Sequence, residues 1–291
     1  MLYGHLLGLY EKALPPDWGW EDRLKTAKEL GFDYLEISID ETDERVERLY
    51  WDKAQRMELL KLSRQLEMPL RSMCLSTHRR FPFGSTDPAL QAKAYELMES
   101  AVVFAEDLGI HVIQLAGYDV YYEFSTKETA LAFMDGMRWS AKIAAKHQIM
   151  LGMEIMDTPF MNSITKHLYY EEQLKSPWYK VYPDLGNLTA WGNDVEAELE
   201  KGISSIVAIH IKETKAVTAT FPGQFKCVPF GMGCVDFVKC FKKLEQLGYV
   251  GPYTMEMWND PNIDNMQAIY NAMKFINEQY SEAIALANKN Y

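Results

Sequence analysis

Short apolar segments that alternate with helical patterns along the whole chain constrain the fold most strongly. Three helical patterns end at a Leu-Gly pair, at 30–31, 108–109 and 247–248, and an apolar segment begins within a few residues. Glycine ends a helix because it adopts the left-handed conformation of the cap without strain. Eight segments have the length and composition of buried strands: 2–10, 34–40, 69–76, 111–117, 149–156, 179–184, 205–212 and 253–258. The alternation predicts an α/β fold with helices between most of these strands.

Helix starts also leave signals in the sequence. Asp87 followed by Pro88 is typical of an N-cap with proline in the first helical position, and Ser125 with Glu128 has the spacing of a capping box. We therefore expect helices to begin at these two points.

Two observations favour a closed barrel over an open doubly wound sheet. No glycine-rich GxGxxG loop follows the first strand, and ionisable residues lie at the ends of the fifth to eighth strands. In an open sheet the outer two of these strand ends would be roughly 14 Å apart, whereas in a barrel they form one arc at the C-terminal mouth. The sequence therefore predicts a single (β/α)₈ barrel domain over residues 1–291.

Four ionisable side chains end these predicted strands: Glu154, Asp184, His210 and Glu256, in LGMEIM, VYPDLG, VAIHIK and YTMEMW. Charged groups are rarely buried without a partner, so three carboxylates and an imidazole inside a fold require something positive between them. Three oxygen donors and one nitrogen suit Mn²⁺, Mg²⁺, Zn²⁺ or Co²⁺ and do not select one of them. We expect one divalent metal ion at this point.

Glu154 and Glu256 come from the outer strands of the arc and can approach a substrate from opposite sides. Two opposed carboxylates and a Lewis acid can remove a proton beside a ketone and return one to the other face, through a metal-bound enediolate. That is the chemistry of an epimerase. Return of the proton to the neighbouring carbon would instead make an aldose-ketose isomerase, and spacing alone leaves both open.

Basic and amide side chains near the predicted mouth are the candidates for substrate and phosphate binding. Lys212 is two residues beyond His210 and shares its strand face, and HRRFPFGS combines arginines, a glycine turn, a hydroxyl and a helix start. Glu36 and Gln114 are expected to orient ligands by hydrogen bonds. The candidate substrate-binding residues are Arg79, Arg80, Asn187, Lys212, Lys215 and Lys226, the last two in a long segment at 213–233 that we expect to cover the site.

Composition excludes several classes of partner. A net charge of −11 and a pI near 5.1 argue against binding to nucleic acid or an anionic membrane. An abasic-site endonuclease, the remote alternative, would need more than one histidine ligand and a basic groove, whereas most of the six histidines lie away from the predicted strand ends. The four cysteines form no CxxC pair, no apolar run has the length of a membrane span, and the first residues lack a signal-peptide pattern. We expect a cytoplasmic protein with reduced thiols, acting on a small molecule. A non-catalytic sugar-phosphate binder is a further alternative.

Motifs over nearly the whole chain resemble one known family. GLYEKALP, FDYLEISIDETDER, MCLSTHRRFPFGS, MEIMDTPFMNS, YPDLGNLTAW, IHIKETKAVT and VPFGMGCVDF are similar to segments of the L-ribulose-5-phosphate 3-epimerases. These enzymes, also called L-xylulose-5-phosphate 3-epimerases, are xylose-isomerase-like TIM barrels of the ascorbate and pentose utilisation pathways. The resemblance implies that Glu154, Asp184, His210 and Glu256 hold the metal, with Glu154 and Glu256 as the acid/base pair.

The resemblance further implies that the chain interconverts L-xylulose 5-phosphate and L-ribulose 5-phosphate. Barrels of this family are often dimers, so a homodimer is the expected assembly. The sequence departs from related patterns at two points. Asn187 stands where free-ketose 3-epimerases have a histidine, which favours a phosphorylated substrate. Met232 stands between two glycines where the family usually has an acidic residue.

Overall fold

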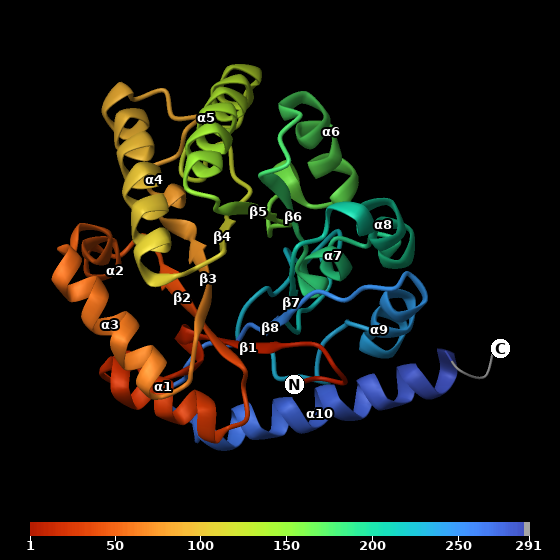
Figure 1. The fold of residues 1–291 in the computed structure, drawn as a ribbon. Helices are drawn as coiled ribbons and strands as arrows, with labels where there is room; N and C mark the ends of the chain where they lie inside the picture. The colour runs from red at the N-terminus through yellow and green to blue at the C-terminus, as the bar shows by residue number, and fades with distance from the viewer. Residues whose placement is uncertain (288–291) are drawn as a thin grey trace.

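Eight parallel strands form the centre of the computed structural model, which describes residues 1–287. Strands β1 to β6 pair in sequence order, β7 pairs with β8, and β8 pairs with β1, as the register Leu7↔Tyr253 shows. Figure 1 shows the strands inside a ring of helices. The strands are β1 (Leu7–Tyr10), β2 (Tyr34–Ile39), β3 (Leu70–Leu75), β4 (Val112–Leu115), β5 (Met150–Glu154), β6 (Tyr179–Tyr182), β7 (Ile209–Ile211) and β8 (Tyr253–Met255).

The barrel closes between β6 and β7 through isolated bridges instead of a regular ladder. Val181 pairs with Ile206, and Asp184 pairs with His210 beyond the end of β6. The backbone nitrogen of His210 donates to the carbonyl of Pro183 at 3.0 Å. The predicted eight-stranded barrel is thereby confirmed, and two candidate metal ligands lie side by side at its closing seam.

Helices connect successive strands and cover the outside of the barrel (Figure 1). The pair α2 and α3 spans the β2–β3 connection, α7 and α8 span β6–β7, and the last helix runs past the N-terminus, where Tyr280 stacks on Tyr3. No helix within residues 1–287 has both the length and the apolar character needed to cross a bilayer. The α-helices are α1 (Trp20–Glu29), α2 (Asp43–Glu47), α3 (Lys53–Gln65), α4 (Pro88–Leu108), α5 (Lys127–Lys146), α6 (Ile164–Leu174), α7 (Leu185–Ala190), α8 (Val195–Gly202), α9 (Phe237–Gln246) and α10 (Asn265–Ala287).

Polar side chains fill much of the barrel interior. Glu36 on β2 contacts Tyr182 on β6 (3.0 Å) and His210 on β7 (2.7 Å), so these three side chains point inward from different sides. The hydroxyls of Tyr34 and Tyr182 both lie 2.7 Å from Oγ1 of Thr254. Because successive strand residues face opposite ways, the apolar residues between them pack outward against the helices. Buried polar groups are tolerated here because they satisfy one another.

The first strand is shorter than the sequence predicts. Residues 2–5 form a tight antiparallel turn in which Leu2 and His5 pair, with Gly4 at φ +98°. Within β1, Gly8 leaves room for a neighbouring ring, since a Cβ there would lie 2.2 Å from the Tyr34 side chain. The predicted range of 2–10 is therefore wrong at its start, and the strand begins at residue 7.

Candidate active site

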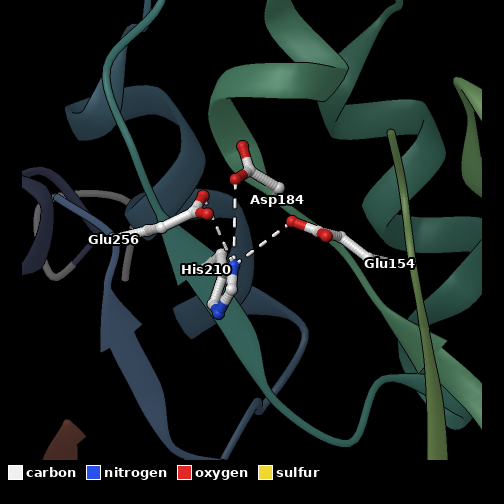
Figure 2. A group of neighbouring side chains, drawn as sticks. All are labelled: Glu154, Asp184, His210 and Glu256. Carbon is white, nitrogen blue, oxygen red and sulfur yellow. Dashed lines mark hydrogen bonds and ion pairs between the residues drawn. The ribbon is translucent and has the colours of Figure 1, made fainter. Parts of the chain in front are cut away.

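Four buried side chains from consecutive strands converge at the C-terminal mouth of the barrel (Figure 2). Glu154 ends β5, Asp184 is the N-cap of α7 just after β6, His210 is in the middle of β7, and Glu256 follows β8 directly. One ligand atom from each residue lies within 4.8 Å of all the others. Nδ1 of His210 is 3.3 Å from Glu154, 3.5 Å from Glu256 and 4.0 Å from Asp184. The structure thus brings together all four residues that the sequence singled out.

The orientation of His210 is fixed from behind by Glu36. Oε1 of Glu36 lies 2.7 Å from Nε2 of the imidazole, and Oε2 accepts hydrogen bonds from Ser72 (2.6 Å) and Tyr182 (3.0 Å). A carboxylate at Nε2 keeps a proton on that nitrogen, so Nδ1, which faces the three other carboxylates, is the nitrogen that can bind a metal ion. This is the arrangement by which proteins orient a metal-binding histidine.

The electrostatics of the cluster favour a cation. Burial raises the pKa of Asp184 to about 8. The Lys212 ammonium lowers this pKa, and the carboxylates of Glu256 and Glu154 raise it further. Burial and the Glu256 carboxylate also raise the pKa of Glu154. Burial opposes ionisation of Glu256 as well, but Lys212 and His210 outweigh it and lower the pKa of that carboxyl. Like charges at this distance resist simultaneous ionisation unless positive charge is added.

The donor set fits a divalent ion. Oδ2 of Asp184 and Oε2 of Glu256 are buried and have no hydrogen bond within residues 1–287, although Nζ of Lys212 is 2.9 Å from each. Unsatisfied buried oxygens are costly, and a metal ion would satisfy them. Carboxylates and one imidazole suit Mn²⁺, Mg²⁺, Zn²⁺ or Co²⁺. The cluster can therefore hold a metal ion, and its chemistry leaves the identity of that ion open.

Two amide side chains lie beside the cluster. Asn187, in the first turn of α7, donates its backbone nitrogen to Asp184 at 2.7 Å and its side-chain nitrogen to the carbonyl of Ile155 at 2.7 Å. The side-chain amide of Gln114 on β4 is 3.5 Å from Nδ1 of His210. Gln114 therefore reaches the metal-facing edge of the imidazole, and Asn187 holds Asp184 in place and also lines the cavity described next.

A small cavity of about 40 Å³ adjoins the cluster. Four of the six basic and amide residues expected to bind substrate line this cavity: Arg79, Asn187, Lys212 and Lys226. The other two lie elsewhere. Arg80 is half exposed and pairs with Asp43 at 2.6 Å, while Lys215 is exposed. Of the two adjacent arginines, only Arg79 turns inward, because the 3-10 helix over Ser76–Arg79 directs the two side chains differently.

Some cavity residues escaped the sequence analysis. Lys12, Asp157 and Trp258 all line the cavity. Lys12 lies two residues beyond the end of β1, so the rule that selected polar groups at strand ends could have found it. Asp157 and Trp258 lie in the loops after β5 and β8, where no periodicity fixes the direction of a side chain. The segment between β7 and α9 supplies Lys226 and covers the cavity from one side.

Comparisons with known proteins show the family to which the chain belongs and agree with its barrel fold. The xylose isomerase-like TIM barrel family matches residues 24–279. A putative L-ribulose-5-phosphate 3-epimerase, SgbU of Escherichia coli (strain K12), is 52% identical over 279 residues, which cover 96% of this chain and 98% of that protein. The L-ribulose-5-phosphate 3-epimerase UlaE of Shigella sonnei (strain Ss046) is 50% identical over 277 residues, covering 95% of each chain.

Solved structures show the same fold at lower sequence identity. The structure of an L-ribulose 3-epimerase superposes with a TM-score of 0.78 at 19% identity, covering 97% of this chain and 96% of the other. A D-allulose 3-epimerase from Methylomonas sp. superposes with a TM-score of 0.75 at 22% identity, covering 95% of this chain and 98% of the other. At these identities the likeness concerns the barrel alone.

Proposed function

The chain belongs to the L-ribulose-5-phosphate 3-epimerases within the xylose isomerase-like TIM barrel family, and from that premise we propose that it interconverts L-xylulose 5-phosphate and L-ribulose 5-phosphate. The observation that carries the proposal is the placement of Glu154 and Glu256. Both are buried, both line the cavity, and both contribute an oxygen to one candidate cation site. Two carboxyl groups beside one Lewis-acid site can invert a carbon next to a ketone, one as the base and the other as the acid.

The residues around the cavity have defined tasks in this reaction. Glu154, Asp184, His210 and Glu256 would hold a divalent cation, which when bound polarises the ketone and makes the neighbouring C–H acidic. One glutamate takes the C3 proton as a base, and the other, as a carboxylic acid, donates a proton to the opposite face, so that the configuration inverts. The two glutamates exchange protonation states in each turnover, and the reverse reaction uses them in opposite order.

Other side chains position the substrate. Lys212 contacts Asp184 and Glu256 and lines the cavity, which puts its ammonium within reach of a substrate oxygen. Asn187 holds Asp184 and also lines the cavity. We assign the phosphate group to Arg79 and Lys226 in place of Arg80 and Lys215, because the first two line the cavity.

The test is incorporation of solvent deuterium at C3, followed by NMR of each epimer in heavy water with Mg²⁺. The wild-type protein should exchange the C3 hydrogen of both epimers and interconvert them. We expect Glu154→Gln and Glu256→Gln each to lower the rate of interconversion at least ~10²-fold at saturating metal. Each variant retains one of the two bases, so it should exchange the hydrogen of one epimer at most, and the two variants should differ in which epimer that is.

Glu96→Gln serves as the control, since the exposed carboxylate of Glu96 pairs with Lys93 and Tyr50 at the surface. Interconversion by both glutamine variants at the wild-type rate would contradict the proposal. Appearance of an aldehyde product would point instead to the aldose-ketose isomerase that the sequence left open.

We propose a cellular setting from the same family membership. The chain would act in the cytoplasm, in the degradation of L-ascorbate, as a single barrel domain that forms a homodimer. Light scattering of the purified protein would test the homodimer, with a mass near twice 33.6 kDa expected.

A further inference from the structure

Two cavities meet at the C-terminal mouth of the barrel and share a wall. The smaller one, of about 40 Å³, is the cavity beside the metal cluster and is called the polar cavity below. The larger one, of about 400 Å³, lies between α10 and the segment that joins β7 to α9, and is called the apolar cavity. Its lining includes Val228, Pro229, Phe230, Met257, Ile263 and Ala268. Lys212, Glu256 and Trp258 line both cavities and form the shared wall.

The polar cavity is too small for a sugar phosphate. Its 40 Å³ hold roughly three water molecules, whereas sites for small organic molecules usually enclose ~300 Å³ or more. The apolar cavity on the other side of the shared wall reaches that size. A substrate can therefore bind at the metal cluster only after one wall of the polar cavity has moved.

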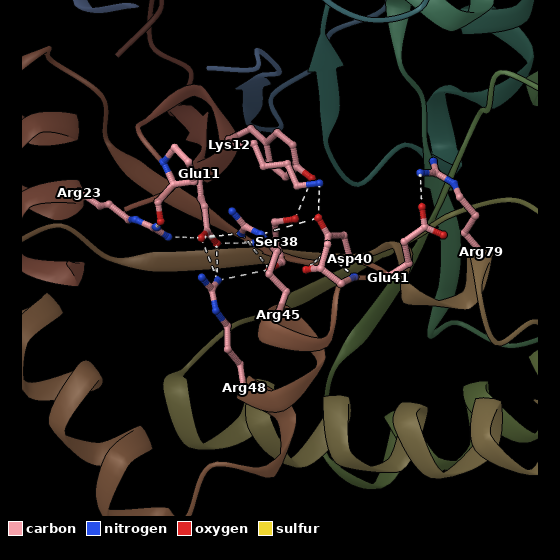
Figure 3. A network of polar contacts seen from close by, with 12 residues as sticks. Glu11, Lys12, Arg23, Ser38, Asp40, Glu41, Arg45, Arg48 and Arg79 are labelled. Atoms are coloured by element: carbon pink, nitrogen blue, oxygen red, sulfur yellow. Dashed lines mark hydrogen bonds and ion pairs between the residues drawn. The ribbon is translucent and has the colours of Figure 1, made fainter. Parts of the chain in front are cut away.

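Ionic contacts hold the opposite side of the polar cavity. Lys12 makes an ion pair with Asp40, and Arg79 lies 3.8 Å from Glu41 (Figure 3). Next to Lys12, the buried carboxylate of Glu11 accepts hydrogen bonds from three guanidinium groups (Figure 3). Displacement of this side would separate buried charges, which is costly. The side formed by the ends of β1 to β3 is therefore the fixed one.

Trp258 is the side chain of the shared wall that can move. Lys212 and Glu256 are only 2.9 Å apart, and Glu256 belongs to the metal cluster. The indole of Trp258 is held by weaker contacts: the ammonium groups of Lys212 and Lys226 lie over its ring at 5.5 and 5.8 Å, and the Tyr10 ring packs against it at 6.2 Å. Contacts of this kind are individually weak.

The backbone beside Trp258 is fixed, so the movement is confined to the side chain. The backbone nitrogen of Asn259 donates to the carbonyl of Lys12 at 2.6 Å, which ties the loop after β8 to the turn after β1. The apolar cavity offers the indole both space and suitable contacts, because phenyl rings and thioethers pack well against aromatic rings. Phe230 and Met257 supply these groups.

We infer that Trp258 is a specificity-determining residue: its indole separates the two cavities, and it must turn into the apolar cavity before a sugar phosphate can reach the metal cluster. The inference rests on the proposed function for the identity of the substrate. An anionic sugar favours the turn, because charge-assisted hydrogen bonds from Lys212 and Lys226 to its oxygens are stronger than the contacts of these ammonium groups with the indole. Water is small enough to occupy the polar cavity with the indole in its present position.

The experiment fills the apolar cavity and follows substrate binding. Ala268 lines that cavity from α10, so a phenyl ring in Ala268→Phe takes the space that the indole needs. We expect kcat/KM for L-ribulose 5-phosphate to fall roughly tenfold, since apparent affinity falls with the fraction of binding-competent molecules. Affinity for Mn²⁺ and the melting temperature should stay at the wild-type values. Ala285→Phe, at an exposed position of the same helix, is the matched control and should change none of the three.

Removal of the indole should remove the effect of the filled cavity. In Trp258→Ala the two cavities are joined, and a phenyl ring at position 268 has no indole to obstruct. The double variant Trp258→Ala with Ala268→Phe should therefore have the same kcat/KM as Trp258→Ala alone. Two substitutions that merely disturbed the structure would instead each lower kcat/KM, and their losses would add.

Fluorine NMR of protein that contains 5-fluorotryptophan tests the movement without turnover. The resonance that is missing from Trp258→Phe identifies residue 258, and relaxation dispersion should show that it exchanges between two environments. Ala268→Phe should abolish this exchange, and saturating L-ribulose 5-phosphate should shift the wild-type protein to the second environment. Ala285→Phe should leave the exchange as it is.

Three results would overturn the inference: an unchanged kcat/KM in Ala268→Phe, an equal loss from this substitution with and without the indole, or fluorine exchange that persists in Ala268→Phe. Failure of the proposed function gives a different pattern. Wild-type protein would then exchange no C3 hydrogen of either epimer, whereas the fluorine exchange and its loss in Ala268→Phe would still show that the indole moves between the two cavities.

Discussion

Replacement of Glu36 tests the orientation of the metal-facing histidine without touching a proposed metal ligand. In Glu36→Gln, the amide oxygen can still accept from Nε2 of His210, and the amide nitrogen can donate to the hydroxyls of Ser72 and Tyr182, which lie 2.6 and 3.0 Å from the present carboxylate. The geometry survives and the negative charge is lost, so we expect about a tenfold loss of metal affinity, or ~1.4 kcal/mol.

Glu36→Leu removes the hydrogen-bond partner as well as the charge. Nε2 of His210 would then be buried without an acceptor, and the proton would be free to move to Nδ1, where a metal ion would bind. The loss should approach 100-fold, or ~2.7 kcal/mol. The order of the two variants follows from the contacts, because one retains the imidazole tautomer and the other releases it.

The assay is a Mn²⁺ titration followed by electron paramagnetic resonance of free ion, with circular dichroism to confirm folding. Glu106→Gln is the matched control, because its carboxylate also lies 2.9 Å from a histidine Nδ1, that of His147, but at the surface. Affinity within twofold of wild type in both Glu36 variants would refute the argument that this carboxylate prepares His210 for a metal.

Three further predictions concern the apo cluster, the barrel interior and the covering segment. Because the pKa of Asp184 is raised to about 8 without metal, a proton competes with the metal ion below that pH. The metal affinity should therefore rise from pH 6 to 8, and calorimetry in buffers of different ionisation enthalpy should show that binding releases a proton. An affinity that does not change with pH would contradict this. Gly8→Ala should destabilise by about 1–3 kcal/mol, since the new Cβ would meet the Tyr34 ring at 2.2 Å, while Gly19→Ala, with nothing within 4 Å, should have little effect in urea unfolding. Glu213→Gln weakens the charge-assisted acceptance of three backbone N–H groups at 3.0–3.1 Å within the covering segment, so proteolysis between residues 214 and 236 should accelerate, and an unchanged cleavage rate would show that this carboxylate does not hold the segment.

Much of the site could be predicted because burial makes charged residues conspicuous. Glu154, Asp184, His210 and Glu256 interrupt apolar runs, and the order of parallel strands in a barrel brings consecutive strand ends together. The structure confirms that convergence, whereas the roles of the individual residues remain predictions. Glu36 was recognisable for the same reason, since it is an isolated acid within YLEISI.

The misses lie where backbone direction changes within one or two residues. The predicted capping box at Ser125 and Glu128 is wrong by one position, because Thr126 and Thr129 form the reciprocal pair at the start of α5. The sequence places Lys12 close to a strand end, but Lys12 lies in a 3-10 turn over Glu11–Ala13, where strand alternation does not give the direction of its side chain. Arg80 was predicted to bind substrate only because it is adjacent to Arg79 in the sequence. Such positions depend on local turns and tertiary ion pairs that no periodic pattern encodes.

Anomalous diffraction from crystals soaked in Mn²⁺ tests the central claim most directly. The account predicts a single strong peak within about 2.0–2.3 Å of one atom each from Glu154, Asp184, His210 and Glu256, with the histidine bound through Nδ1 and Glu36 still at Nε2. A fully active protein whose metal peak lay outside this cluster, or that bound no ion at all, would contradict it.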